Sequence, residues 1–205
     1  MASIEISKLN ITEIYRLMIS AIVPRPIAWV STIDGTGQTN LAPFSYFNAV
    51  SSTPPSLLFC VTRKPDGSKK DTELNILETR EFVVNSSNEW NLEMVNESSA
   101  PYPHGVSEFA KVGATPAASS LVKPPRVLQA GVSMECKLLD TLQVGQGNLG
   151  SSLIIVGQIV AMHVRDDLLI NGEIDFEKYK PLSRLGGQLY GMNTASIEKP
   201  RGVVK

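Results

Sequence analysis

The chain has 205 residues and a formal net charge of -1, with 19 Lys and Arg against 20 Asp and Glu. This length is enough to bury one hydrophobic core, and it predicts a single domain over residues 1–205. The balanced charge excludes a basic track for a nucleic-acid backbone, so we expect a small molecule as the ligand.

The first apolar segment, residues 17–23, is too short to cross a membrane. Glu5, Lys8 and Glu13 precede it, and this mixture of charges is not typical of a signal peptide. We therefore expect a cytoplasmic protein that has no membrane anchor.

Two strands joined by a tight turn are predicted next. Residues 26–33 are rich in β-branched and aromatic side chains, and the Asp-Gly-Thr-Gly sequence at 34–37 favours a hairpin because glycine tolerates a positive φ. The second strand is predicted over residues 38–47. Pro43 within it cannot donate a ladder hydrogen bond, which indicates a sheet edge or a β-bulge.

A strand, a helix and a further strand follow. Residues 56–62 come directly after a break at two prolines and predict the strand, and residues 81–85 predict another. Between them, residues 71–79 have apolar side chains at helical spacing, with Asp71 expected as the N-cap.

The second half of the chain is also predicted to be mainly β. Residues 132–138 and 160–164 alternate apolar and polar side chains, which is the two-residue period of a half-buried strand. Residues 88–126 predict a helix and then Pro- and Ser-rich connections, so we expect an insertion that packs on a barrel.

Residues 145–150 match the GxGxxG fingerprint of dinucleotide-binding folds. The fingerprint requires a helix after the last glycine, whereas residues 153–156 are a run of β-branched and aliphatic side chains. We therefore interpret this segment as a glycine-rich connection between two antiparallel strands.

Metal and acyl-transfer chemistry have no support in the sequence. Cys60 and Cys136 lie alone in apolar segments and are expected to be reduced core thiols. His104 and His163 lack neighbouring ligands for zinc, so no metal site is predicted. A Ser-His-Asp hydrolase is disfavoured because no GxSxG elbow joins a strand to a helix.

Residues 68–72 form a candidate anion site. Ser68, Lys69, Lys70 and Thr72 place hydroxyl groups and cations at the start of the predicted helix, where free N–H groups and the helix dipole favour a phosphate. The alternative, which the segment by itself favours, is an ordinary capped turn in contact with solvent.

Small polar residues on the first predicted hairpin form a second candidate site. If the turn closes, Ser31 and Thr32 meet Asn40, Ala42 and Ser45 across the two strands. A flavin needs donors and acceptors at its pyrimidine edge, close backbone approach and a separate phosphate site. Exposed hydroxyls at a strand end are an equally good interpretation of this segment.

Residues 24–32 and 40–48 closely resemble the opening of the flavin reductase-like, FMN-binding split-barrel proteins. The resemblance continues in the same order over nearly the whole chain, through residues 54–55, 70–72, 81–85, 107–109 and 180–190. It implies a six-stranded antiparallel Greek-key split barrel with peripheral helices. It also implies a homodimer with FMN at the subunit interface, and relatives that include flavoredoxins and monooxygenase reductase components.

The resemblance assigns residues to three parts of the cofactor. The isoalloxazine and ribityl chain would contact Ser31, Thr32, Asn40, Leu41, Ala42 and Ser45. The phosphate would contact Lys70, Asp71 and Thr72, with Ser68 and Arg25. Phe47 and Tyr190 would flank the ring, and Tyr190 would come from the same or the other subunit.

One departure from the family pattern affects the mechanism. Several relatives have a histidine just before the tyrosine of the last motif, where this chain has Gln188, so no catalytic acid is assigned. Hydride transfer to a flavin depends on stacking and orientation more than on an acid or base.

The sequence therefore predicts an FMN-dependent oxidoreductase that takes electrons from NADH or NADPH. Its acceptor would be free flavin, an electron-transfer or monooxygenase partner, or a small molecule. Two alternatives stay open: a protein that holds FMN for electron transfer without using nicotinamide, and a structural barrel that binds no cofactor.

Overall fold

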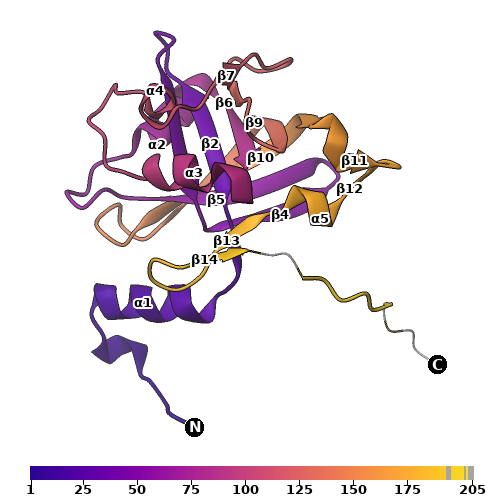
Figure 1. Ribbon diagram of the computed structural model, residues 1–205. Coiled ribbons are helices and arrows are strands. Elements are labelled where there is room, and N and C mark those ends of the chain that lie inside the picture. The colour runs from indigo at the N-terminus through magenta and orange to yellow at the C-terminus, as the bar shows by residue number, and fades with distance from the viewer. Residues whose placement is uncertain (193–194, 201, 203–205) are drawn as a thin grey trace.

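The computed structural model describes residues 1–192, 195–200 and 202, and it consists mainly of antiparallel strands with a few helices around them (Figure 1). Seven strands form one sheet in the order β3-β2-β6-β9-β10-β5-β4. Their bounds are β2 (Ala28–Ile33), β3 (Thr39–Phe44), β4 (Phe47–Ser52), β5 (Pro55–Thr62), β6 (Glu81–Ser86), β9 (Val132–Val144) and β10 (Ser152–Val164).

Smaller elements surround this sheet. Three strands form a separate small sheet: β1 (Arg25–Pro26), β13 (Leu182–Arg184) and β14 (Tyr190–Met192). Two pairs stand apart: β7 (Pro116–Ala117) with β8 (Arg126–Val127), and β11 (Leu169–Ile170) with β12 (Glu173–Ile174). The helices are α1 (Ile11–Ala21), α2 (Asp71–Thr79), α3 (Leu92–Glu97), α4 (Glu108–Val112) and α5 (Phe176–Tyr179), with 3-10 turns at Ile6–Lys8, Glu89–Asn91 and Asp166–Leu168.

The large sheet has seven strands where the family resemblance implied six. The predicted strand over residues 38–47 ends at Phe44 as β3, and residues 47–52 form a further strand, β4, that was not predicted. The chain bends at Ser45 and Tyr46, so β3 ends at one edge of the sheet and β4 begins at the other. Pro43 lies on the edge strand β3, as predicted from its missing N–H group. Within the described residues, no hydrogen-bonded pairing joins the two edges into a closed barrel.

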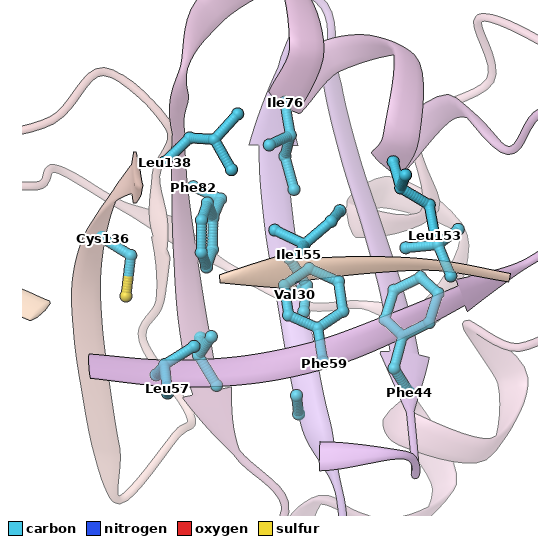
Figure 2. Packing of buried hydrophobic residues seen from close by; sticks show 13 residues of the cluster. Val30, Phe44, Leu57, Phe59, Ile76, Phe82, Cys136, Leu138, Leu153 and Ile155 are labelled. Carbon is cyan, nitrogen blue, oxygen red and sulfur yellow. The ribbon is translucent and has the colours of Figure 1, made fainter. Parts of the chain in front are cut away.

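The sheet nevertheless curls around one core. Phe44 on β3 and Phe59 on β5 are far apart in the strand order, yet their ring centroids are 5.2 Å apart. Phe82 meets Phe59 edge-on at 5.5 Å, and Figure 2 shows these rings between Leu57, Ile76 and Ile155. This open, curled sheet is consistent with a split barrel.

A second apolar cluster covers the outer face of β2 and β3. Trp29 and Leu41 are fully buried there against Val95 and Phe109, which belong to α3 and α4. The indole N–H of Trp29 donates to Ser98 Oγ at 2.9 Å. The predicted insertion therefore does pack on the sheet, and it holds the chain that follows α3 close to β3.

The predicted hairpins are confirmed. At the turn after β2, Asp34 Oδ1 accepts from the N–H groups of Thr36 and Gln38, and Gly37 has φ 95°. The glycine-rich segment at 145–150 joins β9 to β10 antiparallel, and its three glycines with φ above 80° supply the turn.

Helix α2 has the predicted bounds, but its N-cap is Lys70 and Asp71 is its first helical residue. No side chain caps this end, because the carboxylate of Asp71 is bonded to other groups. The N-terminal N–H groups of α2 therefore receive no bond from a capping side chain.

Helix α1 was not predicted, although Asn10 and Glu13 form a capping box at its start. Of its residues only Ile19 is buried, and the helix stands away from the sheet in Figure 1. No helix among the described residues has the length and apolar character needed to span a membrane.

The four residues considered for metal or redox chemistry have ordinary surroundings. Cys136 is buried in the core and Cys60 is half-buried on β5, and burial raises the pKa of both thiols. His104 contacts Asp71 and His163 contacts Glu135. Within the described residues, no cluster of three or more His, Cys, Asp or Glu could hold a metal ion.

Candidate functional site

A cavity of about 500 Å³ lies between the edge strand β3, the start of α2 and the chain after α3. Because β3 is at the sheet edge, no neighbouring strand covers this side of it. The lining residues are Asn40, Ala42, Pro43, Arg63, Lys64, Pro65, Asp66, Lys70, Asp71, Thr72, Ser98, Ser99, Ala100, Pro101, Tyr102 and Glu108. We call this space the α2 cavity.

The β3 wall of the α2 cavity is joined to α2 by a buried hydrogen bond. Asn40 Nδ2 donates to Thr72 Oγ1 at 2.9 Å, and the two residues are 7% and 1% exposed. Ala42 lies two residues further along β3 on the same face, as strand alternation requires. A ligand in this cavity would therefore meet small side chains along β3.

Four cations surround the start of α2, and three of them meet carboxylates. Arg63 Nη1 lies 2.7 Å from Glu73, Lys64 lies 3.4 Å from Asp71, and Lys69 lies 3.4 Å from Glu73. Among the described residues, Lys70 has no carboxylate within ion-pair distance, and its Nζ lies 5.5 Å from the centre of the Phe44 ring. Burial and then the charge of Lys64 lower the pKa of Lys70.

Asp71 holds the chain that covers the cavity rather than pointing to a ligand. Its Oδ2 lies 3.0 Å from His104 Nδ1 and accepts from the N–H of Gly105 at 3.4 Å, while Oδ1 faces Lys64. The predicted role of Asp71 at a phosphate therefore changes, because its carboxylate is already occupied and carries the same charge sign as a phosphate.

Glu108, the first residue of α4, closes another side of the α2 cavity. Its Oε2 accepts the backbone N–H of Leu41 at 2.8 Å, on the open edge of β3. Burial raises the pKa of this carboxyl, and the bond from Leu41 opposes the rise only in part.

A second cavity of about 250 Å³ continues along β3 from the first and shares Pro43 and Ser99 with it. We call it the β3 cavity. Its other lining residues are Tyr15, Ile19, Arg25, Ile27, Phe44, Ser45, Asn96, Arg184 and Tyr190.

Arg25 lines the β3 cavity and not the α2 cavity, so the structure does not bring it to Lys70. Arg25 is 5% exposed, and its guanidinium donates to the carbonyls of Ile19, Ile22 and Leu185 at 2.6, 2.7 and 3.0 Å. Arg25 thus ties the end of α1 to the chain after β13, while its Nε is buried without a hydrogen-bond partner among the described residues.

A third cavity of about 500 Å³ adjoins the β3 cavity and shares Asn96, Arg184 and Tyr190 with it. It lies between α3 and the β13–β14 hairpin, so we call it the hairpin cavity. Leu92, Glu93 and Gln188 complete its lining.

The structure brings eight of the thirteen predicted cofactor contacts to the two cavities along β3. The α2 cavity contains Asn40, Ala42, Lys70, Asp71 and Thr72, and the β3 cavity contains Arg25, Ser45 and Tyr190. Tyr190 reaches its cavity from its own chain.

Five predicted contacts do not line either cavity. Ser31 and Leu41 project to the opposite face of the hairpin from Asn40 and Ala42, where Ser31 Oγ donates to the carbonyl of Pro125 at 2.5 Å. Side chains alternate along a strand, so consecutive residues cannot all face one ligand.

The other three are held by internal contacts. Thr32 accepts a hydrogen bond from Asn75 at 3.0 Å and is fully buried. Phe47 packs against the main core, and Ser68 is an exposed turn residue that donates to Asp66 at 2.6 Å.

Sequence reasoning missed several residues of these cavities, among them Arg63, Lys64, Glu108 and Arg184. Arg63 and Lys64 directly follow the predicted strand at 56–62, and two cations after an apolar strand were a usable signal. Glu108 had no local signal, because its partner is the backbone of a strand 67 residues away.

The α2 cavity can bind an anion. It combines Lys70, a half-buried lysine that pairs with no carboxylate of the described residues, with the uncapped N-terminus of a nine-residue helix. Arg63 Nε is buried there without a hydrogen-bond partner. These groups suit the terminal phosphate of a mononucleotide.

This chain is similar to known proteins over most of its length. Residues 19–183 match the family model described as a flavin reductase like domain. A protein of Aquifex aeolicus (strain VF5) is 42% identical over 178 residues, which is 86% of this chain and 88% of that protein.

Two crystal structures are similar in both sequence and fold. Nitrilotriacetate monooxygenase component B from Bacillus cereus has a TM-score of 0.93 and 35% identity, with 97% of this chain and 98% of that chain covered. The 2-nitrobenzoate 2-nitroreductase NbaA of Pseudomonas fluorescens has a TM-score of 0.89 and 29% identity, with 98% and 96% covered.

Proposed function

The chain belongs to the flavin reductase-like family, and on that premise we propose that it is an FMN-dependent oxidoreductase with NADH or NADPH as electron donor. The observation that carries this proposal is Lys70, a half-buried cation that meets no carboxylate of the described residues and lies at the uncapped start of α2. A flavin mononucleotide supplies the anion that this position lacks.

The phosphate would be held in the α2 cavity. Lys70 would give a charge-assisted hydrogen bond, and the first N–H groups of α2 would add neutral ones. Thr72 and Asn40 already bond to each other, so they would shape the wall more than bind the charge. Asp71 would hold the covering chain in place through His104.

The flavin ring would lie along β3 toward the β3 cavity. Ala42, Pro43 and Ser45 would allow close approach to the backbone, and Tyr190 would flank the ring. A bound flavin would supply two-electron chemistry: it would take a hydride from the reduced nicotinamide and a proton from solvent, and would pass two electrons to an acceptor. The chain's residues position the ring and exclude water from it.

The acceptor is proposed as free flavin, a partner enzyme or a small organic molecule. Component B of a monooxygenase and a nitroreductase are both similar to this chain, which supports an oxygenase partner and a nitro compound as candidates. We also propose that the protein works in the cytoplasm, where both nicotinamide donors occur, and that it forms a homodimer.

Titration and kinetics of the purified protein test this function. FMN should bind and remain with the protein on gel filtration, and anaerobic NADH or NADPH should bleach the flavin absorption at about 450 nm. A protein that binds FMN but is reduced by neither donor would be an electron-transfer protein that does not use nicotinamide. A protein that takes up no FMN would overturn the proposal.

A further inference from the structure

The hairpin cavity lies at the far end of the proposed flavin site and is not needed for the flavin itself. The α2 cavity has room for the phosphate end and the β3 cavity follows it along the strand, whereas the hairpin cavity adds about 500 Å³ beyond them. A volume in this range is typical of a small-molecule site. Because it shares Tyr190 with the β3 cavity, a ligand there would lie next to the ring.

One wall of the hairpin cavity consists of two stacked side chains, those of Arg184 and Tyr190. Arg184 and Tyr190 are direct partners across the β13–β14 pair, and the guanidinium carbon of Arg184 lies 4.3 Å from the centre of the Tyr190 ring. Arg184 Nη2 donates to the carbonyl of Gly187 at 2.7 Å, and the Tyr190 hydroxyl donates to Asn96 at 3.2 Å. These contacts fix the orientation of both planes.

The charge of Arg184 is not neutralised by an ion pair with any residue that the structure describes. Arg184 is the only cation in the cavity lining, and among the described residues no carboxylate lies within ion-pair distance of it. Glu93, the only acid among the described residues of the lining, is exposed on α3, where solvent and salt screen its charge. A fixed, planar guanidinium is suited to a carboxylate or a phosphate.

The remaining walls complete a chemical profile. Leu92 supplies an apolar surface and Gln188 an amide, so the cavity offers stacking and apolar contacts beside one fixed cation. We propose that the hairpin cavity binds the reaction partner of the flavin, and that Arg184 selects a planar molecule that carries a carboxylate or a phosphate. This inference rests on the proposed function, because it places the flavin ring in the adjoining cavity.

The first test compares two probes of the same shape on the FMN-loaded wild-type protein. Benzoate and its neutral isostere benzamide are titrated, and the change in the flavin absorption spectrum gives their dissociation constants. Benzoate should bind at least about tenfold more tightly, which corresponds to about 1.4 kcal/mol. Equal affinity for the two probes, or no spectral change with either, would overturn the inference.

Arg184→Gln should remove the preference for benzoate when both proteins are compared fully saturated with FMN. Arg184→Lys should keep part of the preference, because it retains the charge but not the planar fork. Arg165→Gln is the matched control, since Arg165 also stacks on an aromatic ring, that of Trp90 at 4.4 Å, outside the cavities. An unchanged preference in a folded Arg184→Gln protein would also overturn the inference.

Steady-state kinetics distinguish the two sources of the anion. Reduced nicotinamide mononucleotide carries a phosphate that its riboside lacks, so Arg184→Gln should raise the KM of the mononucleotide alone if the electron donor uses this cavity. If only benzoate loses affinity, the cavity belongs to a carboxylate-bearing acceptor. Wild-type protein that takes up no FMN would instead overturn the proposed function, and this inference with it.

Discussion

Lys70 differs from its neighbouring cations because no carboxylate of the described residues lies beside it. Arg63, Lys64 and Lys69 each meet Asp71 or Glu73, so their charges are compensated within the folded chain. Burial, and then the charge of Lys64, lower the pKa of Lys70. An anion at the start of α2 would remove this penalty, which links Lys70 to a ligand rather than to stability.

Replacing Lys70 by alanine should therefore weaken FMN more than riboflavin. The expected loss is roughly 1–3 kcal/mol for FMN, because one charge-assisted hydrogen bond to the phosphate disappears. Fluorescence titration of both flavins measures it, and Lys69→Ala is the control because Lys69 is exposed and paired with Glu73. Equal weakening of FMN and riboflavin would show that Lys70 does not meet the phosphate.

Glu108 affects stability in two ways, through its hydrogen bond to the backbone of β3 and through the burial of its charge, and different substitutions separate the two. Its carboxyl accepts the Leu41 N–H at the open edge of β3, and burial raises its pKa. Glu108→Leu should lower the free energy of unfolding at pH 7 by roughly 1–3 kcal/mol, because that N–H loses its acceptor. Glu108→Gln keeps an acceptor and should be at least as stable as the wild type at this pH.

The pH dependence of the Glu108→Gln effect follows from the sign of the shift. Folding raises the pKa of this carboxyl, so its contribution to stability is fully present when the pH is below its pKa in the unfolded chain. The contribution is lost as the pH rises through its pKa in the folded protein. The stability of Glu108→Gln relative to the wild type should therefore increase between pH 4 and pH 7 in urea unfolding. A difference that is constant over this range would contradict the assignment.

At the scale of elements, strand β9 holds a distant loop through Glu135. This carboxylate is fully buried and accepts the backbone N–H groups of Ser120, Leu121 and Val122 at 2.6, 2.6 and 3.1 Å. Burial opposes its ionisation, but these N–H groups and His163 outweigh burial, so the pKa of Glu135 is lowered. The loop between β7 and β8 is thus fixed to the sheet.

Glu135→Gln should lower the free energy of unfolding at pH 7 by about 3 kcal/mol. Both oxygens of the carboxylate accept hydrogen bonds, whereas a glutamine amide has only one oxygen that can accept. Glu81→Gln is the control, because Glu81 accepts only one N–H of the same loop, that of Lys123. The contribution of Glu135 is present above its unfolded pKa and is lost as pH falls through its lowered folded pKa. Urea unfolding should therefore show the two proteins converging below about pH 4.

The elements also explain how far local patterns could predict the site. The hairpin at 34–37 and the bounds of α2 depend on turn residues and on periodicity within a few positions, and the sequence contains both. Side chains alternate along a strand, so Ser31 and Leu41 point away from the face that carries Asn40, and only part of the expected contact set could face one cavity.

At the scale of the whole molecule, the unpredicted helix α1 presents an apolar face to solvent. Ile11, Tyr15, Met18 and Ile22 follow helical spacing and are 55%, 52%, 43% and 58% exposed. Exposed apolar surface of this kind is typical of an interface. It supports the proposed homodimer, and Tyr15 of the same face also lines the β3 cavity.

Met18→Glu together with Ile22→Glu should therefore shift the protein from dimer to monomer in sedimentation velocity. Both positions are exposed, so the fold should be retained and the far-UV circular dichroism unchanged. Leu128→Glu, at an apolar residue that is 61% exposed elsewhere, is the control. A double variant that sediments as the wild type does would contradict a dimer interface at α1.

The mainly β architecture, the hairpins, helix α2, the family and two of the segments that line the α2 cavity could be predicted from the amino-acid sequence. These features depend on neighbours within a few residues or on an ordered set of motifs. Three features of the site depend on the folded chain: Asp71 meets His104, Arg25 lies apart from Lys70, and Arg184 and Tyr190 line one cavity with Asn96. Such pairs come from segments far apart in the chain, and the curl of the open sheet fixes the distances between them.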